Sequence, residues 1–302
     1  MTEAPLLEAR GLRVTFDGAV VLDEVELATR GARVLVVGDV VPVVRLLSGT
    51  SGPGGARAEI SAGELRLMGR ALGEHYGHLG AAPDDLPFPA RTKLRAFLRL
   101  VARVATGESR RGAAALADGC IERLGLEDLA GQRLDRIDLS ARKAALVAVA
   151  AVQGSEALLL HEPFTGLAAE GVAAVMSVVG KAVEGRATVI AVAHLRLSTP
   201  SAELLPHATD VLVFRGGRLL IHTDGPGLLA ESRVYSLTVI EGGLELAGAL
   251  EVEGVAVMGG PLHFALTLPR GHDVADVLRL ADSIGAAVLT CEPLLGAMPV
   301  GP

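Results

Sequence analysis

The sequence predicts an α/β fold built around a mostly parallel sheet, followed by a small α+β unit. Three observations predict it. The segment ARVLVVG, which ends at Gly38, is apolar apart from Arg33, as expected for a strand that is buried on both faces of a sheet. Strand-like and helix-like segments alternate on either side of an all-helical stretch. After about Glu231 the order of elements becomes strand, helix, two strands, helix and strand.

The first 40 residues read as strands. LLEARGLRVTF alternates apolar and polar residues, DGAVVLDEVELATR follows it, and ARVLVVG leads through Gly38 toward a helix, as in the βα units that bind nucleotides. A Gly/Pro loop at residues 51–58 precedes a strand and turn in ELRLMGRAL. These elements predict the amino-terminal part of a nucleotide-type α/β domain.

The pattern becomes helical from Thr92, which is a suitable N-cap residue, and helical segments continue as far as ARKAALVAVAAV. Three further strand patterns, ALLLHEP, ATVIAVAH and ATDVLVFRGGRLLIH, are separated in part by a helix around residues 172–183. The pattern therefore predicts a domain at residues 1–231, with a helical insertion at about 90–152, and a small βαββαβ domain at 232–302.

Composition excludes several classes of protein. The chain carries 28 Lys and Arg against 35 Asp and Glu, a net charge of −7, which argues against nucleic acid as a partner. Its longest apolar run, residues 144–152, is far shorter than the roughly 20 residues of a membrane-spanning helix, and the first residues do not resemble a secretory signal. The two cysteines, Cys120 and Cys291, have no metal-ligand spacing and are expected to be small buried side chains. These features predict a cytoplasmic protein without a metal site.

The order of motifs in residues 6–230 resembles the nucleotide-binding subunit of an ATP-binding-cassette (ABC) transporter. The resemblance rests on the opening LLEARGLRVTFDGAVVLDEVELATRGARVLVVG, then RLLSG, LSARK, LLLHEPFTGL, TVIAVAH and VLVFRGGRLL, in that order and spacing. It implies a P-loop NTPase-like nucleotide-binding domain with a helical insertion. The tail resembles a C-terminal extension found in an exporter branch of the family, and its βαββαβ order implies a ferredoxin-like domain.

The segment that should bind phosphate departs from the family pattern. A phosphate loop reads G-x-x-x-x-G-K-[ST], whereas residues 38–45 read GDVVPVVR, so that only Gly38 is kept. Valines resist the φ > 0 conformations that cradle phosphate, and Pro42 lacks an N–H donor. Asp39 would repel phosphate by about 4 kcal/mol at 4 Å. Arg45 is the nearby cation, and we interpret it as an arginine on the helix surface rather than as a phosphate ligand.

Other positions of the site have also changed. By the resemblance, His161 stands where the family has the Asp that supports Mg²⁺, and an imidazole suits that ion poorly. Asp84 lies near the family's Q-loop glutamine, and Ala168 replaces a further Asp. In the signature segment LSARK only Ser140 matches among the polar and glycine positions. Glu162 matches the family's catalytic base.

Two more positions match the family, because His194 stands where a histidine contacts the γ-phosphate and Phe16 stands where an aromatic ring stacks on adenine. The candidate catalytic residues are therefore Glu162 and His194, as vestiges of the family site. The candidate nucleotide-binding residues are Phe16, Gly38, Arg45 and Ser140. Because the groups that position phosphate and metal are missing, we predict no ATP hydrolysis, and neither ATP nor Mg²⁺ is predicted as a firm cofactor.

Three functional hypotheses follow. In the first, the chain is a pseudo-ATPase that acts as a scaffold or regulator at the inner face of the cell membrane, with a permease subunit and a competent cassette subunit or a second copy as partners. A partner's phosphate loop would then face Arg142 and Lys143, which we expect to be solvated at the start of a helix. In the second, Phe16, Arg45, Glu162 and His194 hold ATP in an unconventional active site. In the third, the protein is a soluble sensor whose tail binds a small ligand.

Overall fold

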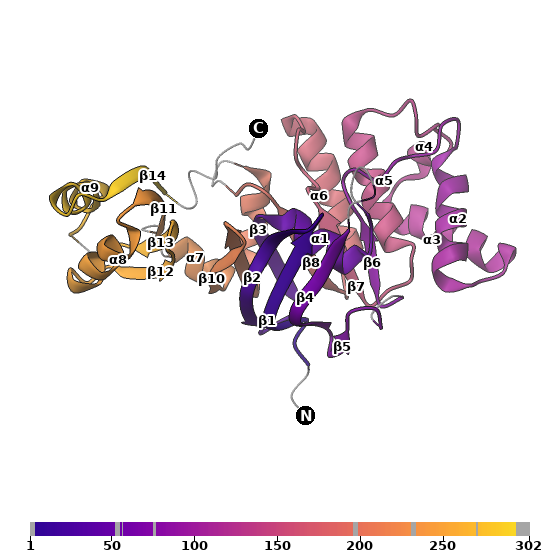
Figure 1. The fold of residues 1–302 in the computed structure, drawn as a ribbon. Coiled ribbons are helices and arrows are strands. Elements are labelled where there is room, and N and C mark those ends of the chain that lie inside the picture. Colours follow the sequence, from indigo (N-terminus) through magenta and orange to yellow (C-terminus); the bar gives the residue numbers. More distant parts are fainter. Residues whose placement is uncertain are drawn as a thin grey trace.

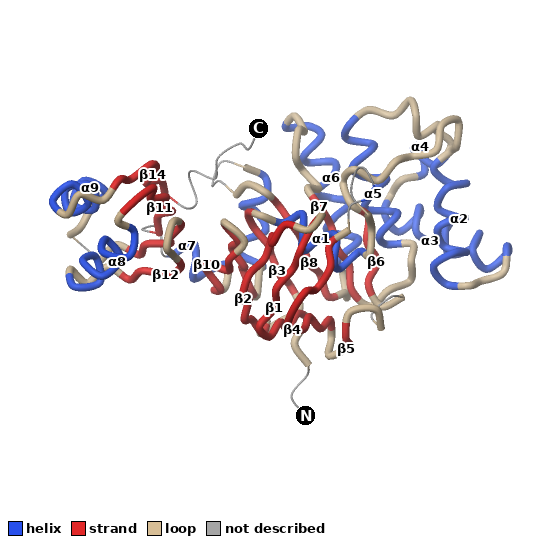
Figure 2. The backbone as a smooth tube through the Cα atoms, viewed as in Figure 1, coloured by secondary structure: helices blue, strands red, loops and turns tan. Residues whose placement is uncertain are grey.

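The computed structural model describes residues 4–51, 55, 57–74, 77–195, 199–230, 234–269 and 271–293, which form three sheets and the helices around them. Figures 1 and 2 show a large unit of two sheets with a group of helices at one end, and a small unit at the opposite end. The chain thus has the predicted α/β architecture, followed by an α+β unit.

The first sheet is antiparallel and holds most of the amino-terminal strands. It consists, in spatial order, of β2 (Ala19–Ala28), β1 (Leu7–Phe16), β4 (Ala58–Leu67) and β5 (Arg70–Ala71). Its apolar face packs against α1 (Val40–Ser48), which lies between this sheet and the central one.

The central sheet carries the candidate site. Its spatial order is β10 (Arg218–Thr223), β9 (Asp210–Arg215), β3 (Arg33–Gly38), β8 (Ala187–Val192), β7 (Ala157–His161) and β6 (Leu79–Ala82). All neighbouring pairs are parallel except β9 and β10. Because side chains alternate along a strand, β3 sends Val34 and Val36 into the core beneath the first sheet, and Leu35 and Val37 into the core beneath the helices. A strand buried on both faces explains the apolar run.

The helices cover the other face of the central sheet. They are α2 (Leu94–Thr106), α3 (Arg110–Leu124), α4 (Glu127–Ala130), α5 (Leu139–Ala151) and α6 (Ala169–Val183), followed by the 3₁₀ helix η2 (Pro200–His207) and α7 (Gly225–Ala230). The expectation that Thr92 caps α2 is wrong. Lys93 is the N-cap residue, and the Thr92 hydroxyl instead donates to the Ala90 carbonyl.

The small unit has its own sheet and core. It consists of β11 (Val234–Glu241), α8 (Gly243–Val252), β12 (Ala256–Gly259), β13 (His263–Thr267), α9 (Val274–Ser283) and β14 (Ala287–Pro293). The antiparallel order β12-β13-β11-β14 is that of a ferredoxin-like βαββαβ fold. Residues 231–233, where the sequence predicts the domain boundary, lie outside the described residues.

The small unit rests on the end of the central sheet beside β10. The Arg215 guanidinium donates to the Ser236 hydroxyl, and the His263 ring lies against Gly216, where a Cβ would approach it to 2.5 Å. Burial, together with the Arg215 charge, lowers the pKa of His263. Contact between the units therefore involves both the turn that joins β9 to β10 and strand β10 itself.

The structure bears on two features that composition raised, the membrane-spanning helix and the two cysteines. None of the described helices combines the length and the apolar character needed to cross a membrane. Cys120 is buried as expected, whereas Cys291 is only half-buried, although burial still raises the pKa of its thiol to about 11.

Candidate functional site

A cleft of about 650 Å³ opens at the carboxyl end of the central sheet, the edge at which α/β proteins bind ligands. Its lining includes Gly38 at the end of β3 and Asp39 after it, His161 at the end of β7 and Glu162 after it, and Ala193 after β8. The turn after β9 closes one side with Gly216 and Gly217. The described lining contains carboxylates but neither Lys nor Arg. The cleft therefore lies where α/β proteins bind nucleotides, but its described lining offers no Lys or Arg that could attract a phosphate.

The junction between β3 and α1 differs from the phosphate loop that the family resemblance implies. The strand ends at Gly38 and the helix begins at Val40, so Asp39 alone connects them. Asp39 is the N-cap residue, but its carboxylate accepts a hydrogen bond from the Gly217 amide at 3.3 Å rather than capping α1. Val41 and Pro42 line the cleft where a phosphate loop would present amides. The backbone nest for phosphate does not form.

Arg45 is not the surface residue that the sequence suggested. Its side chain is buried, and its guanidinium pairs with Asp85 and donates to the Thr50 hydroxyl (3.1 Å) and the Ser51 carbonyl (3.2 Å). The interpretation as a helix-surface arginine is therefore wrong, because Asp85, 40 residues away, folds over the helix and satisfies the charge. Arg45 does not line the described cleft.

Lys143 likewise contradicts the expectation of a solvated cation. Its side chain is only 3% exposed, and Nζ donates to Asp84 Oδ1 at 2.5 Å and to the Glu162 carbonyl at 2.6 Å. Asp84 follows β6 and Glu162 follows β7, so one ammonium ties together the ends of two neighbouring strands. The expectation of a solvated Lys143 is therefore wrong, because the ammonium is held inside the chain.

Arg142 is engaged inside the chain as well. Its guanidinium carbon lies 4.7 Å from the centroid of the Phe88 ring and its Nη2 donates to the Leu86 carbonyl at 2.8 Å. Phe88 also meets Phe97 of α2 edge to face, with centroids 5.6 Å apart. A cation–π contact and an aromatic pair thus fix the loop after β6. The expectation of a solvated Arg142 is wrong for the same reason as for Lys143.

His161 accepts a hydrogen bond through one of its ring nitrogens. Its Nδ1 accepts a hydrogen bond from the Asp84 amide at 3.2 Å. Burial lowers its pKa, although the charges of Glu162 and Asp84 oppose the shift, so the ring is neutral at pH 7. Among the described residues, no three His, Cys, Asp or Glu side chains lie close enough together to hold a metal ion.

Both the backbone and the carboxylate of Glu162 are fixed by hydrogen bonds within the chain. Its φ of +50° is unusual for a residue other than glycine, and its amide donates to the Ala191 carbonyl at 2.9 Å. The carboxylate accepts from the Ala193 amide at 2.5 Å through Oε1 and from the Thr165 hydroxyl through Oε2. Both oxygens therefore have protein partners, which fix the loops after β7 and β8.

The remaining candidates lie around the cleft rather than in it. Phe16 ends β1 and is half-buried, and the Ser140 hydroxyl is 3.4 Å from the Gly171 carbonyl, to which it donates. His194 follows Ala193, and its Nδ1 is buried with no hydrogen-bond partner within the described parts of the chain. Of the six candidates only Gly38 and Glu162 line the described cleft.

These residues do not fit MgATP. A triphosphate needs backbone amides and a cation, and Mg²⁺ needs oxygen ligands that are free to coordinate. Here Asp39 occupies the head of α1, the nearest cations are neutralised by Asp84 and Asp85, and a neutral His161 stands at the end of β7. The chemistry of the cleft therefore disfavours a phosphate ligand.

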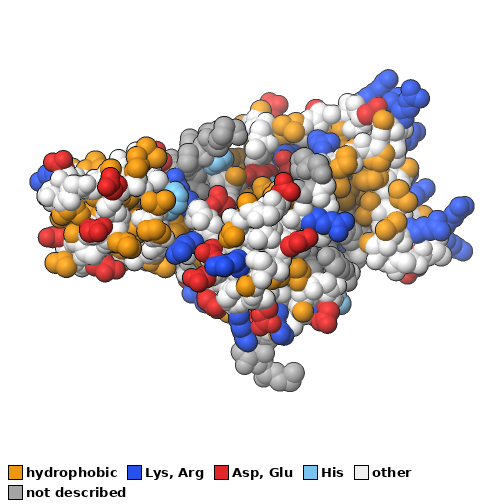
Figure 3. Space-filling view, viewed as in Figure 1, with side chains coloured by type: hydrophobic (Ala, Val, Ile, Leu, Met, Phe, Trp, Pro, Cys, Tyr) orange, Lys and Arg blue, Asp and Glu red, His pale blue; other side chains and the backbone are white. Residues whose placement is uncertain are grey.

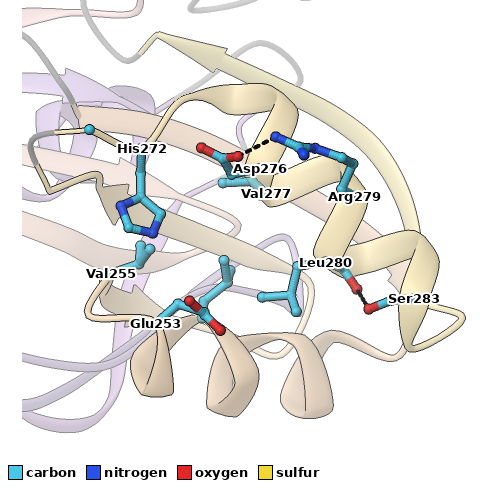
Figure 4. A pocket seen from close by; sticks show the side chains of 10 residues that line it. Glu253, Val255, His272, Asp276, Val277, Arg279, Leu280 and Ser283 are labelled. Atoms are coloured by element: carbon cyan, nitrogen blue, oxygen red, sulfur yellow. Dashed lines mark hydrogen bonds and ion pairs between the residues drawn. The ribbon is translucent and has the colours of Figure 1, made fainter.

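A second cavity of about 430 Å³ lies in the small unit, beside α8 and α9 (Figure 4). Arg279 pairs with Asp276 one turn earlier in α9, and the Ser283 hydroxyl donates to the Leu280 carbonyl at 2.7 Å. Asp276, Arg279 and Ser283 are therefore already engaged within α9, which gives little support to a ligand-sensing site.

Comparison with solved structures identifies the fold. One similar structure is cbiO1 from Clostridium perfringens, described as part of the ABC transporter complex cbiONQ, with a TM-score of 0.58 at 18% identity over 83% of this chain and 98% of that chain. Another, described as the ATP-binding subunit of an ABC transporter, has a TM-score of 0.58 at 15% identity over 74% and 92%. This chain has the ABC nucleotide-binding fold. No protein-family model matches the sequence, and no curated protein matches it.

In this ABC fold, the structure adds residues that sequence reasoning missed. Asp85 was not singled out, and Asp84 was considered only as a replaced glutamine. The sequence signal was two adjacent carboxylates directly after a predicted strand. Pairing them with Arg45 and Lys143 requires the parallel order of β3, β8, β7 and β6, which brings these strand ends together.

Proposed function

We propose that this chain is a cassette-type subunit that does not hydrolyse ATP and serves as a scaffold or regulator for a membrane permease, in export or a related membrane process. One observation carries the proposal. The two buried cations closest to the lost phosphate and signature motifs, Arg45 and Lys143, are each neutralised by a carboxylate of the loop after β6. A cation held in this way is unavailable to a phosphate, whereas the frame of the fold remains intact.

The loop after β6 is the candidate contact for the permease. Arg45, Arg142 and Lys143 reach it from α1 and α5 and hold Asp84, Asp85 and Leu86 in place. Its outer residues Pro87, Pro89 and Ala90 remain exposed. A loop that is already rigid loses little conformational entropy when it binds, so these contacts favour a docking role over a catalytic one.

We further propose that residues 1–231 and 232–302 are two domains, and that the protein works at the inner face of the cell membrane. A separate sheet and core in the small unit support the division. A competent cassette subunit remains the proposed source of ATP hydrolysis in the complex, with a second copy of this chain as the other candidate partner.

Equilibrium binding of MgATP to the purified chain tests the absence of nucleotide chemistry. We expect no saturable binding at millimolar ATP and no turnover above buffer, with the same result for Glu162→Gln. Saturable binding that is lost in the variants Phe16→Ala or Arg45→Ala would instead favour an unconventional ATPase. Turnover that Glu162→Gln abolishes would refute the proposal outright.

Membrane association tests the docking role. In cells we expect the chain to sediment with membranes, and Phe88→Asp to release it, because this change removes the ring that Arg142 and Phe97 hold. Leu289→Asp, on an exposed part of the small unit, is the matched control and should leave sedimentation unchanged. Equal sedimentation of both variants would contradict docking through the loop after β6.

A further inference from the structure

The two ends of the molecule carry opposite charge. The small unit, residues 234–293, holds eight acidic and two basic residues, a net charge of −6 out of −7 for the whole chain. The helical insertion, residues 90–152, holds seven acidic and twelve basic residues, a net charge of +5. Figure 1 places α2 and α8 at opposite ends, and Figure 3 shows groups of Lys and Arg side chains at the α2 end and in the middle of the molecule but few on the small unit. Neither end can therefore neutralise the other within one chain.

Helix α2 presents two parallel stripes to solvent. Residues four apart lie on one face of a helix, so Ala96, Leu100 and Val104 form an apolar stripe, in which Leu100 is 55% and Val104 77% exposed. A basic stripe runs beside it and consists of Arg95, Arg99 and Arg103. Asp118 of α3 pairs with Arg95 (3.3 Å) and Arg99 (3.0 Å) and holds this stripe in place. Such a face suits an apolar, acidic helix.

Helix α8 has the complementary face. Leu244 and Val252 are 69% and 87% exposed, and Gly248 lies between them with nothing within 4 Å of the position that a Cβ would take. Exposed carboxylates, Glu245 and Glu251, flank this stripe. Both apolar stripes span eight residue steps, about 12 Å at the rise of an α-helix. The faces match in length, and a larger side chain of α2 has room above Gly248.

We propose that α2 of one copy of this chain packs against α8 of a second copy, and that the contact is repeated twice across a twofold axis. The occupant is a second copy because the basic apolar face and the acidic apolar face belong to the same chain but lie at opposite ends of it. A twofold arrangement uses both faces of each chain and closes, so it does not propagate into a fibre. Pairing of α8 with α8, or of α8 with an anionic lipid surface, would bring like charges together.

The contact is separate from the proposed docking to a permease, because it involves neither the cleft nor the loop after β6. Analytical ultracentrifugation of the full chain at tens of micromolar tests it. We expect a dimer at low salt that weakens as salt rises, since the facing charges are exposed. We expect Arg103→Glu and Glu251→Arg each to weaken association about tenfold, because each turns an attraction into a repulsion at both contacts.

Mixing the two variants separates this interface from any other. A heterodimer of the Arg103→Glu chain with the Glu251→Arg chain has one wild-type contact and one with both charges exchanged, so association should return. Arg111→Glu on α3 makes the same charge change off the α2 stripes and should leave the dimer intact. A monomer at low salt, a dimer that neither reversal weakens, or a mixture that does not reassociate would each overturn the proposal.

Discussion

The two edges of the central sheet differ in what their charged residues do. At the amino edge Asp210, at the start of β9, is fully buried and accepts from the Arg30 and Gly31 amides, the Thr209 hydroxyl and the His222 ring. At the carboxyl edge, where ligands bind in α/β folds, Lys143 and Arg45 pair with Asp84 and Asp85.

At both edges of the sheet, buried charges are therefore used to hold the fold together. In both places, charged groups find their partners within the chain and join segments far apart in sequence. At the amino edge this links the β2–β3 connection to β9, and at the carboxyl edge it links α1 and α5 to the loop after β6. If this is right, substitutions at the carboxyl edge should change stability rather than catalysis.

Lys143→Met should have the largest effect, a loss of about 2–3 kcal/mol in the free energy of unfolding, because it leaves Asp84 and the Glu162 carbonyl without their buried donor. Urea denaturation measures the change. Lys93→Met, at an exposed lysine before α2, is the matched control and should change the free energy by less than about 0.5 kcal/mol. Equal effects in the two variants would show that the contacts of Lys143 stabilise the fold no more than an exposed lysine does.

Asp210→Asn should cost about 2 kcal/mol at pH 7, because it removes the charge that four donors share. Burial by itself would raise the pKa of Asp210, but the hydrogen bonds from His222, Arg30, Gly31 and Thr209 outweigh it and lower the pKa. The stabilisation is therefore present above the unfolded-state pKa of about 3.9 and is lost as pH falls through the folded-state value.

Denaturation of wild type and Asp210→Asn between pH 3 and pH 7 tests that sign. The wild type should lose its advantage over the variant as the pH falls below about 4. A difference between them that stays constant over this range would show that Asp210 acts through packing rather than through its charge.

Glu162→Gln should lower the free energy of unfolding by about 1 kcal/mol, because an amide oxygen accepts from the Ala193 amide and Thr165 less strongly than a carboxylate. Thermal unfolding is the measurement. Glu170→Gln, in the exposed first turn of α6, is the control. An unchanged stability for Glu162→Gln would mean that this carboxylate is kept for a reason other than structure.

Gly180→Ala should stabilise the protein by about 0.5–1 kcal/mol, since a glycine inside a helix costs that much and a Cβ there meets nothing within 4 Å. Gly171 in the same helix is the matched control. A Cβ at Gly171 would approach Ser140 to 3.3 Å, so Gly171→Ala should gain less. A gain at Gly171 equal to that at Gly180 would show that Ser140 of α5 moves away from the new Cβ at little energetic cost.

Much of the fold follows from short-range patterns. The apolar run up to Gly38, the helical spacing in the insertion and the strand–helix order of the tail appear as β3, α2 to α5 and the ferredoxin-like unit. The errors concern individual charged side chains. Arg45, Arg142 and Lys143 were expected at the surface because cations in helices usually lie there, and all three are engaged inside the chain.

The sequence by itself determined which secondary elements form, their order, and that residues 38–45 keep only Gly38 of the phosphate-loop pattern, because these are local properties of residue type and spacing. Only the tertiary structure decided what replaced the rest of that pattern. Asp85 reaches Arg45 across 40 residues and Asp84 reaches Lys143 across 59, and both pairs depend on parallel strands that end at one edge of the sheet. Charge pairing between distant segments is a property of topology, which no short stretch of sequence specifies.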